Sequence, residues 1–380
     1  MNSSTGSARS SGAADAVQIV VQPWILRLSL WVVLATFLVL LATIVMARVV
    51  RRQRSRVLDR DLVPVRSDVL AIASGDDDEE ADGRLRRLRG RAAELVEPLL
   101  VGYLSKVRGA PAQRIVDILM AHGLVARARR GLTSWSGTRR ARSAWVLGVM
   151  RIGDAASEVV PLLQDRDRGV SVTAARSLGM LRDDSSADAL LAAVAPGRRG
   201  RGELPVWVVV EALGGLGADA AEAIGRALQS EDASTRAVAA MTIGRGQHLS
   251  QRSRLLDVVA HEEDPTVLAA IARSLGEIGD PSVVPTLTGL TDRAHSRSVR
   301  LSAISALGEI GGPAATEVLT ALLADGDTGV EELTAEALSG LGRPGVDVLQ
   351  TAARAGLAGA AAAEYALVMH SLREPMPGGA

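Results

Sequence analysis

Two residue types are scarce in this chain, and their scarcity limits its chemistry. Cysteine is absent, and aromatic residues make up only 2% of the 380 residues. Without cysteine the chain has no disulfide, no thiolate zinc site and no cysteine nucleophile. The few aromatic residues argue against a large aromatic-lined cofactor pocket. Hydrophobic residues make up 47% of the chain and are mainly Ala, Leu and Val, which favours small, closely packed helices.

An excess of either charge is also missing. The chain has 43 basic and 43 acidic residues, so its formal net charge is +0. Neutrality argues against a protein built mainly to coat nucleic acid. Lys106 is the only lysine, and this reliance on arginine indicates the coding bias of a GC-rich bacterial genome.

Motifs for common catalytic and metal sites are absent from the sequence. It contains no G-x-x-x-x-G-K-[ST] phosphate loop, no G-x-S-x-G nucleophile elbow and no H-E-x-x-H zinc motif. The five histidines are scattered along the chain, and no two share a helix face. The sequence therefore predicts no catalytic residue, no metal and no cofactor.

The N-terminal part has a long uncharged run. Residues 28–47 carry no charge, and as a helix these 20 residues would rise about 30 Å, one hydrocarbon thickness. We therefore predict a disordered tail over 1–23 and a single transmembrane helix over 24–48. A cleaved signal peptide is the alternative, but the run is too long for its apolar region and no A-x-A site closes it.

The flanking charges predict the orientation of that helix. Five arginines follow the apolar run between Arg48 and Arg56, whereas only Arg9 and Arg27 precede it. The positive-inside rule then places the N-terminus outside the inner (cell) membrane and the rest of the chain in the cytoplasm. Residues 49–83 are predicted to be a basic juxtamembrane segment and an acidic linker, since the six acids of "SGDDDEEADG" repel one another. A calcium loop is excluded because the alternating ligand spacing is missing.

Helical periodicity begins at Arg84, and from about residue 138 the chain repeats itself. Residues 84–137 are predicted to form an N-terminal helical cap. The later repeats share an aliphatic anchor residue, separated by steps of 31, 35, 30, 32, 32 and 31 residues, which is the mark of a repeat architecture. The anchors are Leu147, Leu178, Leu213, Ile243, Leu275, Leu307 and Leu338.

Each repeat also has predicted helix ends. Aspartate lies eleven residues before four of the anchors, where it would cap the helix N-terminus, at Asp167, Asp232, Asp264 and Asp327. Glycine follows six of the anchors, and a second glycine often lies four residues after the anchor, as in the two "LGEIG" segments at 275–279 and 307–311. We expect these glycines to end the capped helix, with a second helix following.

The repeat unit resembles a known family. The stretch "VRLSAISALGEIGGP" from Val299 to Pro313 is similar to the short bacterial HEAT repeats, also called PBS-lyase HEAT-like repeats. The resemblance implies an all-α protein: a right-handed α-solenoid of about seven to eight helix pairs over 138–373, followed by a flexible tail over 374–380. Tetratricopeptide repeats would need aromatic positions that the chain lacks, and ankyrin repeats would need "TPLHxA".

The helices of a solenoid form an extended surface for a large partner. We expect the second helix of each pair to line the concave side. The candidate partner-binding residues lie near the anchors and would form a mixed, mainly basic ladder: Arg140, Arg176, Arg236, Arg273, Glu277, Arg300 and Glu309. The alternative for the arginines is pairing with the cap Asp of a neighbouring repeat. The basic segment 127–142 is either a structural joint or a docking patch.

Together these features predict a membrane-anchored cytoplasmic scaffold. It would bind and position a protein partner, such as a membrane enzyme, at the inner membrane face. Two alternatives stay open. One is a chromophore-lyase-like enzyme, which the resemblance alone implies, and the other is a helical-repeat protein that binds an anionic ligand or nucleic acid, although net neutrality leads us to expect no nucleic acid.

Overall fold

The computed structural model describes residues 31, 34, 36–43, 45–46, 48, 65–75, 78–195, 204–246, 248–356 and 358–373. The chain divides into two compact units, Met1–Asp68 and Val69–Ala380. The predicted tails at 1–23 and 374–380 and much of the predicted transmembrane helix 24–48 lie outside the described residues. Within the described part, no helix is both long and apolar enough to cross a membrane.

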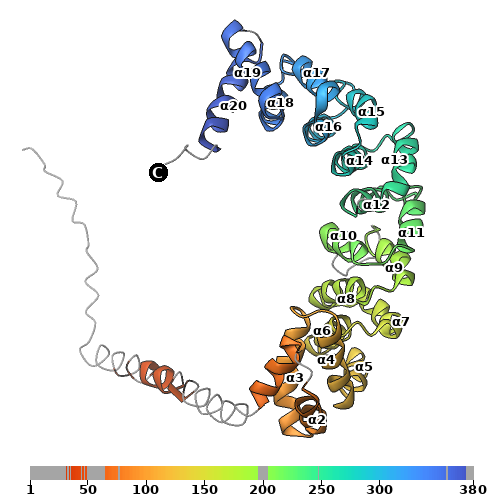
Figure 1. Cartoon of the computed structure of the whole chain (residues 1–380), viewed down its shortest axis with the longest axis vertical. Helices are drawn as coiled ribbons and strands as arrows, with labels where there is room; N and C mark the ends of the chain where they lie inside the picture. Colours follow the sequence, from red (N-terminus) through yellow and green to blue (C-terminus); the bar gives the residue numbers. More distant parts are fainter. Residues whose placement is uncertain are drawn as a thin grey trace, which may run out of the picture. The chain divides into compact units, whose positions relative to one another are not determined.

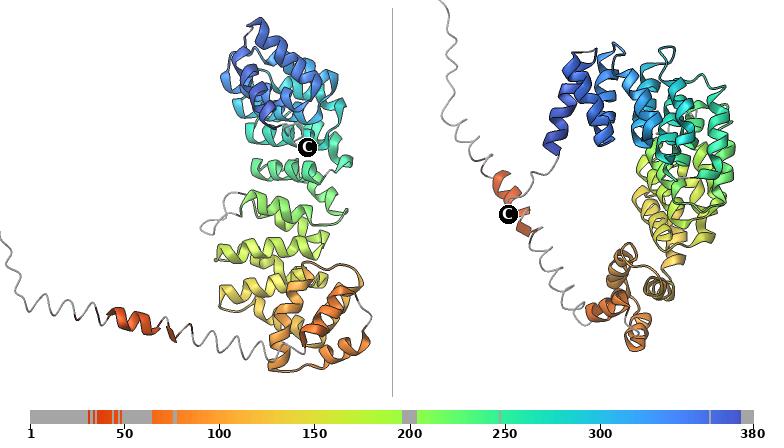
Figure 2. Two further views of the ribbon diagram at one scale, coloured as in Figure 1. Left: turned by 60° about the vertical axis from the view of Figure 1, so that its left-hand side comes forward. Right: turned by 45° about the horizontal axis from the view of Figure 1, so that its top comes forward.

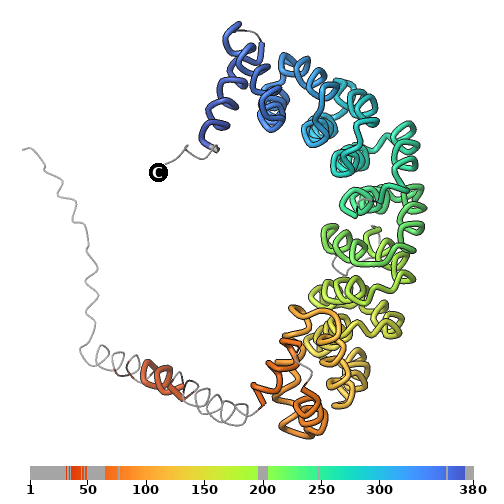
Figure 3. The backbone as a smooth tube through the Cα atoms, in the orientation of Figure 1, coloured from red at the N-terminus to blue at the C-terminus, as the bar shows by residue number. Residues whose placement is uncertain are grey.

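The second unit is built from helices, and its described residues include no strand. From α5 onward the helices stand in two rows (Figures 1 and 3). The inner row holds the helices that carry the anchor residues: α6 (Gly137–Val149), α8 (Arg168–Leu181), α10 (Val206–Gly214), α12 (Ala233–Arg245), α14 (Pro265–Ile278), α16 (Arg297–Ile310) and α18 (Thr328–Gly340).

The outer row holds the helices that lie between them in sequence. These are α5 (Leu124–Leu132), α7 (Ala156–Val159), α9 (Ala187–Ala192), α11 (Ala220–Ala227), α13 (Arg252–Val259), α15 (Val284–Leu290), α17 (Gly312–Leu322) and α19 (Arg343–Ala355). Short 3-10 turns lead into or extend several of them. The last helix, α20 (Ala360–Arg373), packs against α18 and α19. The solenoid predicted from the repeats is therefore confirmed, with seven helix pairs from α6 to α19.

The anchor residues form the core of the stack. All seven anchors are at most 1% exposed. Successive inner helices pack directly on one another, as the contacts of α14 with α12 and α16 show, and the left-hand view of Figure 2 shows the stack. The four predicted Asp caps are confirmed; each accepts a hydrogen bond from a backbone N–H in the first turn of its helix, and Asp264, for example, accepts from Thr266 and Val267.

The two glycines of each "LGEIG" segment have different roles, which corrects one expectation. Gly279 and Gly311 end α14 and α16 in positive-φ conformations of +72° and +66° that favour glycine. Gly276 lies inside α14, where a Cβ would come within 2.7 Å of the Ala306 backbone in α16. This glycine therefore sets the close approach of neighbouring inner helices.

The same close approach explains a second correction. The first, capped helix of each pair lines the inner side, and not the second helix (Figure 1). Glycine after the anchor lets the capped helices pack at backbone distance in most repeats, as Gly148 does against Ser177 and Gly244 against Ser274. The more closely spaced row becomes the inside of the curve.

The N-terminal end of the unit is more ordered than the sequence predicted. Residues 65–74 are helical, and α2 (Glu79–Arg87) begins inside the acidic run that we expected to be a linker. Asp78 caps α2 by accepting from Ala81, and acids in the first turn suit the positive end of the helix dipole. Ala81 and Leu85 of α2 are buried, and α2 packs against α4 (Ala110–Ala121), which follows α3 (Arg91–Leu104).

Candidate partner-binding surface

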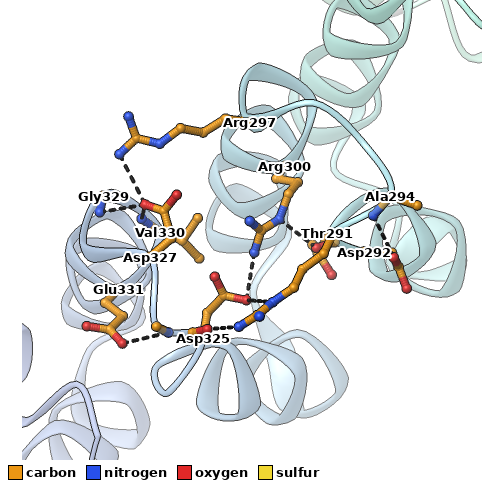
Figure 4. Close-up of polar contacts among 12 residues, drawn as sticks. Thr291, Asp292, Ala294, Arg297, Arg300, Asp325, Asp327, Gly329, Val330 and Glu331 are labelled. Carbon is orange, nitrogen blue, oxygen red and sulfur yellow. Dashed lines mark hydrogen bonds and ion pairs between the residues drawn. The ribbon is translucent and has the colours of Figure 1, made fainter.

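Three of the candidate arginines are held in ion pairs across repeat boundaries. Arg140 of α6 pairs with Asp165, with Nε and Oδ2 2.6 Å apart, and Arg236 of α12 pairs with Glu262 at 2.7 Å. Arg300 of α16 pairs with Asp325 at 2.7 Å (Figure 4). These guanidinium groups are buried or nearly so.

The same arginines also fasten the loop that precedes their own helix. Nη1 of Arg140 donates to the Ser134 carbonyl at 2.8 Å, and Nη1 of Arg236 donates to the Ser230 carbonyl at 2.8 Å. Nε of Arg300 donates to Thr291 at 3.0 Å. Each guanidinium thus joins two successive repeats. The acid is the residue two before the cap Asp of the next repeat, and not the cap Asp itself.

These contacts lower the pKa of each carboxyl. The hydrogen bond from Arg140 holds the pKa of Asp165 below its ordinary value although burial opposes it, and Arg300 does the same for Asp325. Burial raises the pKa of Glu262, but the hydrogen bonds from Arg236 and from the Asp264 backbone outweigh it, so the net shift is downward. The paired acids are therefore ionised at neutral pH.

The other four candidates are exposed on the inner row. Arg176 of α8 lies over the indole ring of Trp207 in α10, 5.1 Å from its centroid, and its Nε is 3.6 Å from Glu211. The residues of "VWVVVEALG" therefore have two different roles. Val208, Val209 and Val210 are buried in the core, whereas Trp207 is 54% exposed at the surface. This cation–π pair bridges α8 and α10 at the surface.

Arg273, Glu277 and Glu309 continue the exposed row over α14 and α16. Burial and the neighbouring charge of Glu277 raise the pKa of Glu309, and the charge of Arg273 opposes them. The exposed row therefore carries charges of both signs, and Glu277 and Glu309 are neighbouring acids within it. Glu211 was missed by sequence reasoning, although its position two residues before the anchor Leu213 matches that of Arg176 and Arg273.

Three of the six arginines in the basic segment 127–142 form ion pairs inside the unit. Arg127 pairs with Glu97 at 2.5 Å, and Arg129 pairs with Asp154 at 2.6 Å and with Glu158 at 3.2 Å. Together with Arg140 these residues tie α5 and α6 to their neighbours. The contacts favour the structural joint over the docking patch.

A comparison with protein families supports the repeat interpretation. Residues 252–342 match the family model for HEAT repeats. This part of the chain is therefore similar to HEAT repeats. The matched residues run from α13 to the end of α18 and include four candidate residues: Arg273, Glu277, Arg300 and Glu309.

Solved helical proteins resemble the HEAT-repeat chain at low identity. Human deoxyhypusine hydroxylase in complex with glycerol is 18% identical over 66% of this chain and 99% of its own, with a TM-score of 0.29. Kap121p bound to Nup53p is 12% identical over 79% of this chain and 38% of its own, with a TM-score of 0.49. The CpcE–CpcF complex of phycocyanin lyase from Nostoc is 17% identical over 65% and 94%, with a TM-score of 0.29. No curated protein matches the chain in sequence.

The HEAT repeats offer no metal centre in their described residues. No group of three or more His, Asp or Glu side chains there is placed to hold a metal ion. His122 is buried and lies 2.9 Å from the Leu85 carbonyl, so the surrounding helices already supply a partner for it. The chemistry that the described surface offers is recognition by exposed arginine, tryptophan and glutamate side chains.

Proposed function

We propose that this HEAT-repeat protein is a membrane-anchored scaffold that binds a protein partner along its inner row and holds it at the inner membrane face. The stacked pair Arg176–Trp207 carries this proposal. Arginine and tryptophan are enriched among the residues that dominate protein–protein binding energy. Here both lie exposed, on adjacent inner helices, and the charged side chain of Glu211 lies beside them.

The mixed charge of the inner row favours a protein over a nucleic acid. Glu211, Glu277 and Glu309 stand on the same row as Arg176 and Arg273, and phosphates would meet repulsion at each acid. The chromophore-lyase alternative rests on resemblance alone. A protein surface with charges of both signs is the better match for this row.

The anchor is proposed from the uncharged run of residues 28–47 and the arginines that follow it. The described positions from 31 to 48 are helical and exposed, including Phe37 at 61%, Val39 at 64% and Met46 at 65%. Apolar side chains on every side of a helix suit a lipid environment. Tethering raises the effective concentration of a membrane-bound partner, so modest affinity would suffice.

The partner-binding part is tested by crosslinking in cells with the full-length protein. A photoreactive amino acid replaces Glu211 beside the stack, and the matched control replaces Leu249, which is 64% exposed and lies before the outer helix α13. We expect a discrete adduct from position 211 that disappears in the Trp207→Ala background. Equal labelling from both positions, or an adduct that survives Trp207→Ala, would refute partner binding at the stack.

The anchoring part is tested separately by fractionation. The full-length protein should stay in the membrane pellet after alkaline carbonate extraction, and a variant with Arg in place of Leu38 and Leu40 should not, because charge at the helix centre is costly in lipid. A tag at residue 2 should be open to protease added outside the cell. Extraction of the unaltered protein into the soluble fraction would overturn the anchor.

A further inference from the structure

A hollow of about 770 Å³ lies near the N-terminal end of the inner row. Its walls are the segment between α3 and α4, helix α4 itself, and the C-terminal ends of α6, α8 and α10. Three large apolar side chains on these walls are partly exposed: Met120 at 45%, Trp145 at 38% and Met180 at 38%. The volume is within the range of ligand-binding pockets, roughly 300–1,000 Å³.

Three arginines line this hollow without a charge partner. Arg108, Arg151 and Arg182 are exposed, and the lining includes no Asp or Glu. Within the described part of the chain, none of the three side chains makes an ion pair or hydrogen bond. The contrast with Arg140, Arg236 and Arg300 is clear, because each of those arginines has an acid in ion-pair contact and a backbone carbonyl as hydrogen-bond acceptor. The hollow is thus a concentrated positive charge beside apolar side chains.

The backbone conformation at two of these arginines favours glycine, which indicates that the arginine side chain itself has a role there. Arg151 and Arg182 have φ values of +53° and +58°, and they are the two non-glycine residues with positive φ in the described part of the chain. Both lie four residues after an anchor. Later repeats place glycine there, at Gly279, Gly311 and Gly342, with φ from +66° to +72°.

An arginine in this conformation is less stable than glycine, because its Cβ crowds the following carbonyl. Two successive repeats therefore keep arginine where the fold itself favours glycine. Strained positions of this kind point to a role for the side chain. Both side chains face one hollow, so the role belongs to that hollow.

We propose that the hollow binds an acidic peptide segment of a protein partner, with an apolar side chain of that segment packed among Met120, Trp145 and Met180. Guanidinium groups bind carboxylates through paired N–H donors, and methionine adapts to apolar groups of varied shape. The hollow is recessed between helix ends, which suits an extended chain better than a flat membrane surface. This inference rests on the proposed function, since it gives the chemistry of the partner.

Binding is measured with the full-length protein purified in detergent. The probe is a short fluorescein-labelled peptide of glutamates and aspartates interrupted by leucines, followed by fluorescence anisotropy. The test variant is Arg151→Gly/Arg182→Gly, which installs the residue that later repeats use. The control variant is Arg343→Ala, which removes an exposed arginine of α19 away from the hollow. A peptide with lysines in place of the acids tests the sign of the charge.

We expect saturable binding of the acidic peptide, weakened about tenfold or more in the double glycine variant and unchanged in Arg343→Ala. The thermal midpoint of the double glycine variant should equal or exceed that of the unaltered protein, because glycine relieves the backbone at both positions. The loss of binding would then be separated from any loss of folding.

Three results would overturn the inference: equal peptide affinity in the unaltered and double glycine proteins, equal affinity for the lysine peptide, or no binding. Arginine-dependent binding of phosphatidylglycerol vesicles in place of the peptide would assign the hollow to lipid headgroups and also overturn it. The adduct from position 211 reports the proposed function independently. A persistent adduct without peptide binding refutes only the hollow, and peptide binding without an adduct refutes only the partner at the Arg176–Trp207 stack.

Discussion

Arg300 of α16 and Asp325, which lies before α18, form an ion pair across a repeat boundary in which each side chain is only 8% exposed (Figure 4). The same two repeat positions hold Arg140 with Asp165 and Arg236 with Glu262. At the other three boundaries neither charge is present. There the two positions hold Ser171 and Gly200, Val206 and Ser230, and Leu268 and Ala294. Since an unpaired buried charge is costly, the two charges occur together or not at all.

Replacing only the arginine of the Arg300–Asp325 pair should destabilise the protein strongly. Arg300→Leu leaves the Asp325 carboxylate in a largely buried site with only the more exposed Arg293 beside it. We expect the free energy of unfolding to fall by about 2–4 kcal/mol. Urea unfolding followed by circular dichroism measures the change.

The repeat boundary between α14 and α16, which lacks the charged pair, supplies the control for that variant. Arg300→Leu/Asp325→Ala reproduces the pair Leu268 and Ala294 that the chain itself uses between α14 and α16. The double variant should recover more than half of the lost stability, because no charge is then left buried without a partner. If the two single losses simply add in the double variant, the pair is not coupled as described.

The same carboxyls should make the solenoid sensitive to acid. The pKa of Asp325 and that of Asp165 are lowered by their arginines from the ordinary value of 3.8. A lowered pKa contributes stability that is fully present above the ordinary value and is lost as pH falls through the folded-state value. The thermal midpoint should therefore be flat from about pH 7 to pH 5 and fall below about pH 4. The Arg300→Leu/Asp325→Ala variant should show a shallower fall, and an equal fall would contradict the assignment.

The repeat period predicted the fold because the residues that define the period meet structural requirements of the fold. An aliphatic anchor at 0–1% exposure and a capping Asp eleven residues earlier each follow from one local requirement, burial or an unpaired N–H. Such requirements recur in every repeat, so Leu275 and Asp264 have counterparts along the chain. The acidic run near Asp78 was misjudged because its charges could equally cap a helix or repel one another.

The surface was harder to predict because its residues depend on neighbouring repeats. The stack of Arg176 on Trp207 joins helices whose anchors are 35 residues apart, and nothing local in either segment indicates the contact. The sequence around Arg300 fits a structural role and a binding role equally well. Only the position of Asp325 in space decides that it is structural.

The glycine that follows the anchor should resist substitution in most repeats. In Gly276→Ala the new Cβ would lie 2.7 Å from the Ala306 Cα, so α14 and α16 must move apart. We expect a loss of about 1–3 kcal/mol in the free energy of unfolding. Gly289→Ala in α15 is the matched control, because a Cβ there meets no atom within 4 Å. Its stability should be unchanged or rise by about 0.5 kcal/mol. Similar losses in both variants would show that backbone freedom, and not close packing, governs Gly276.

Glu309 should respond to pH in the direction opposite to that of the paired acids. Burial, followed by the charge of Glu277, raises its pKa above the ordinary value of 4.5, with Arg273 opposing. A raised pKa contributes stability below the ordinary value and loses it as pH rises through the folded-state value, so the ionised form is the less favourable one. Glu309→Gln should therefore raise the free energy of unfolding at pH 7 by about 0.5 kcal/mol or less, after solvent screening.

The dependence on pH distinguishes this effect of the Glu309 charge from a general gain in the free energy of unfolding. The advantage of Glu309→Gln should vanish near pH 4, where the carboxyl is protonated in both states and resembles the amide. Glu317→Gln on the outer helix α17, where the glutamate is also exposed, is the matched control for the substitution itself. Glu277→Gln should reduce the benefit of Glu309→Gln, since it removes the second cause of the shift. A benefit of Glu309→Gln that stays constant from pH 7 to pH 4 would mean that packing, and not charge, is responsible.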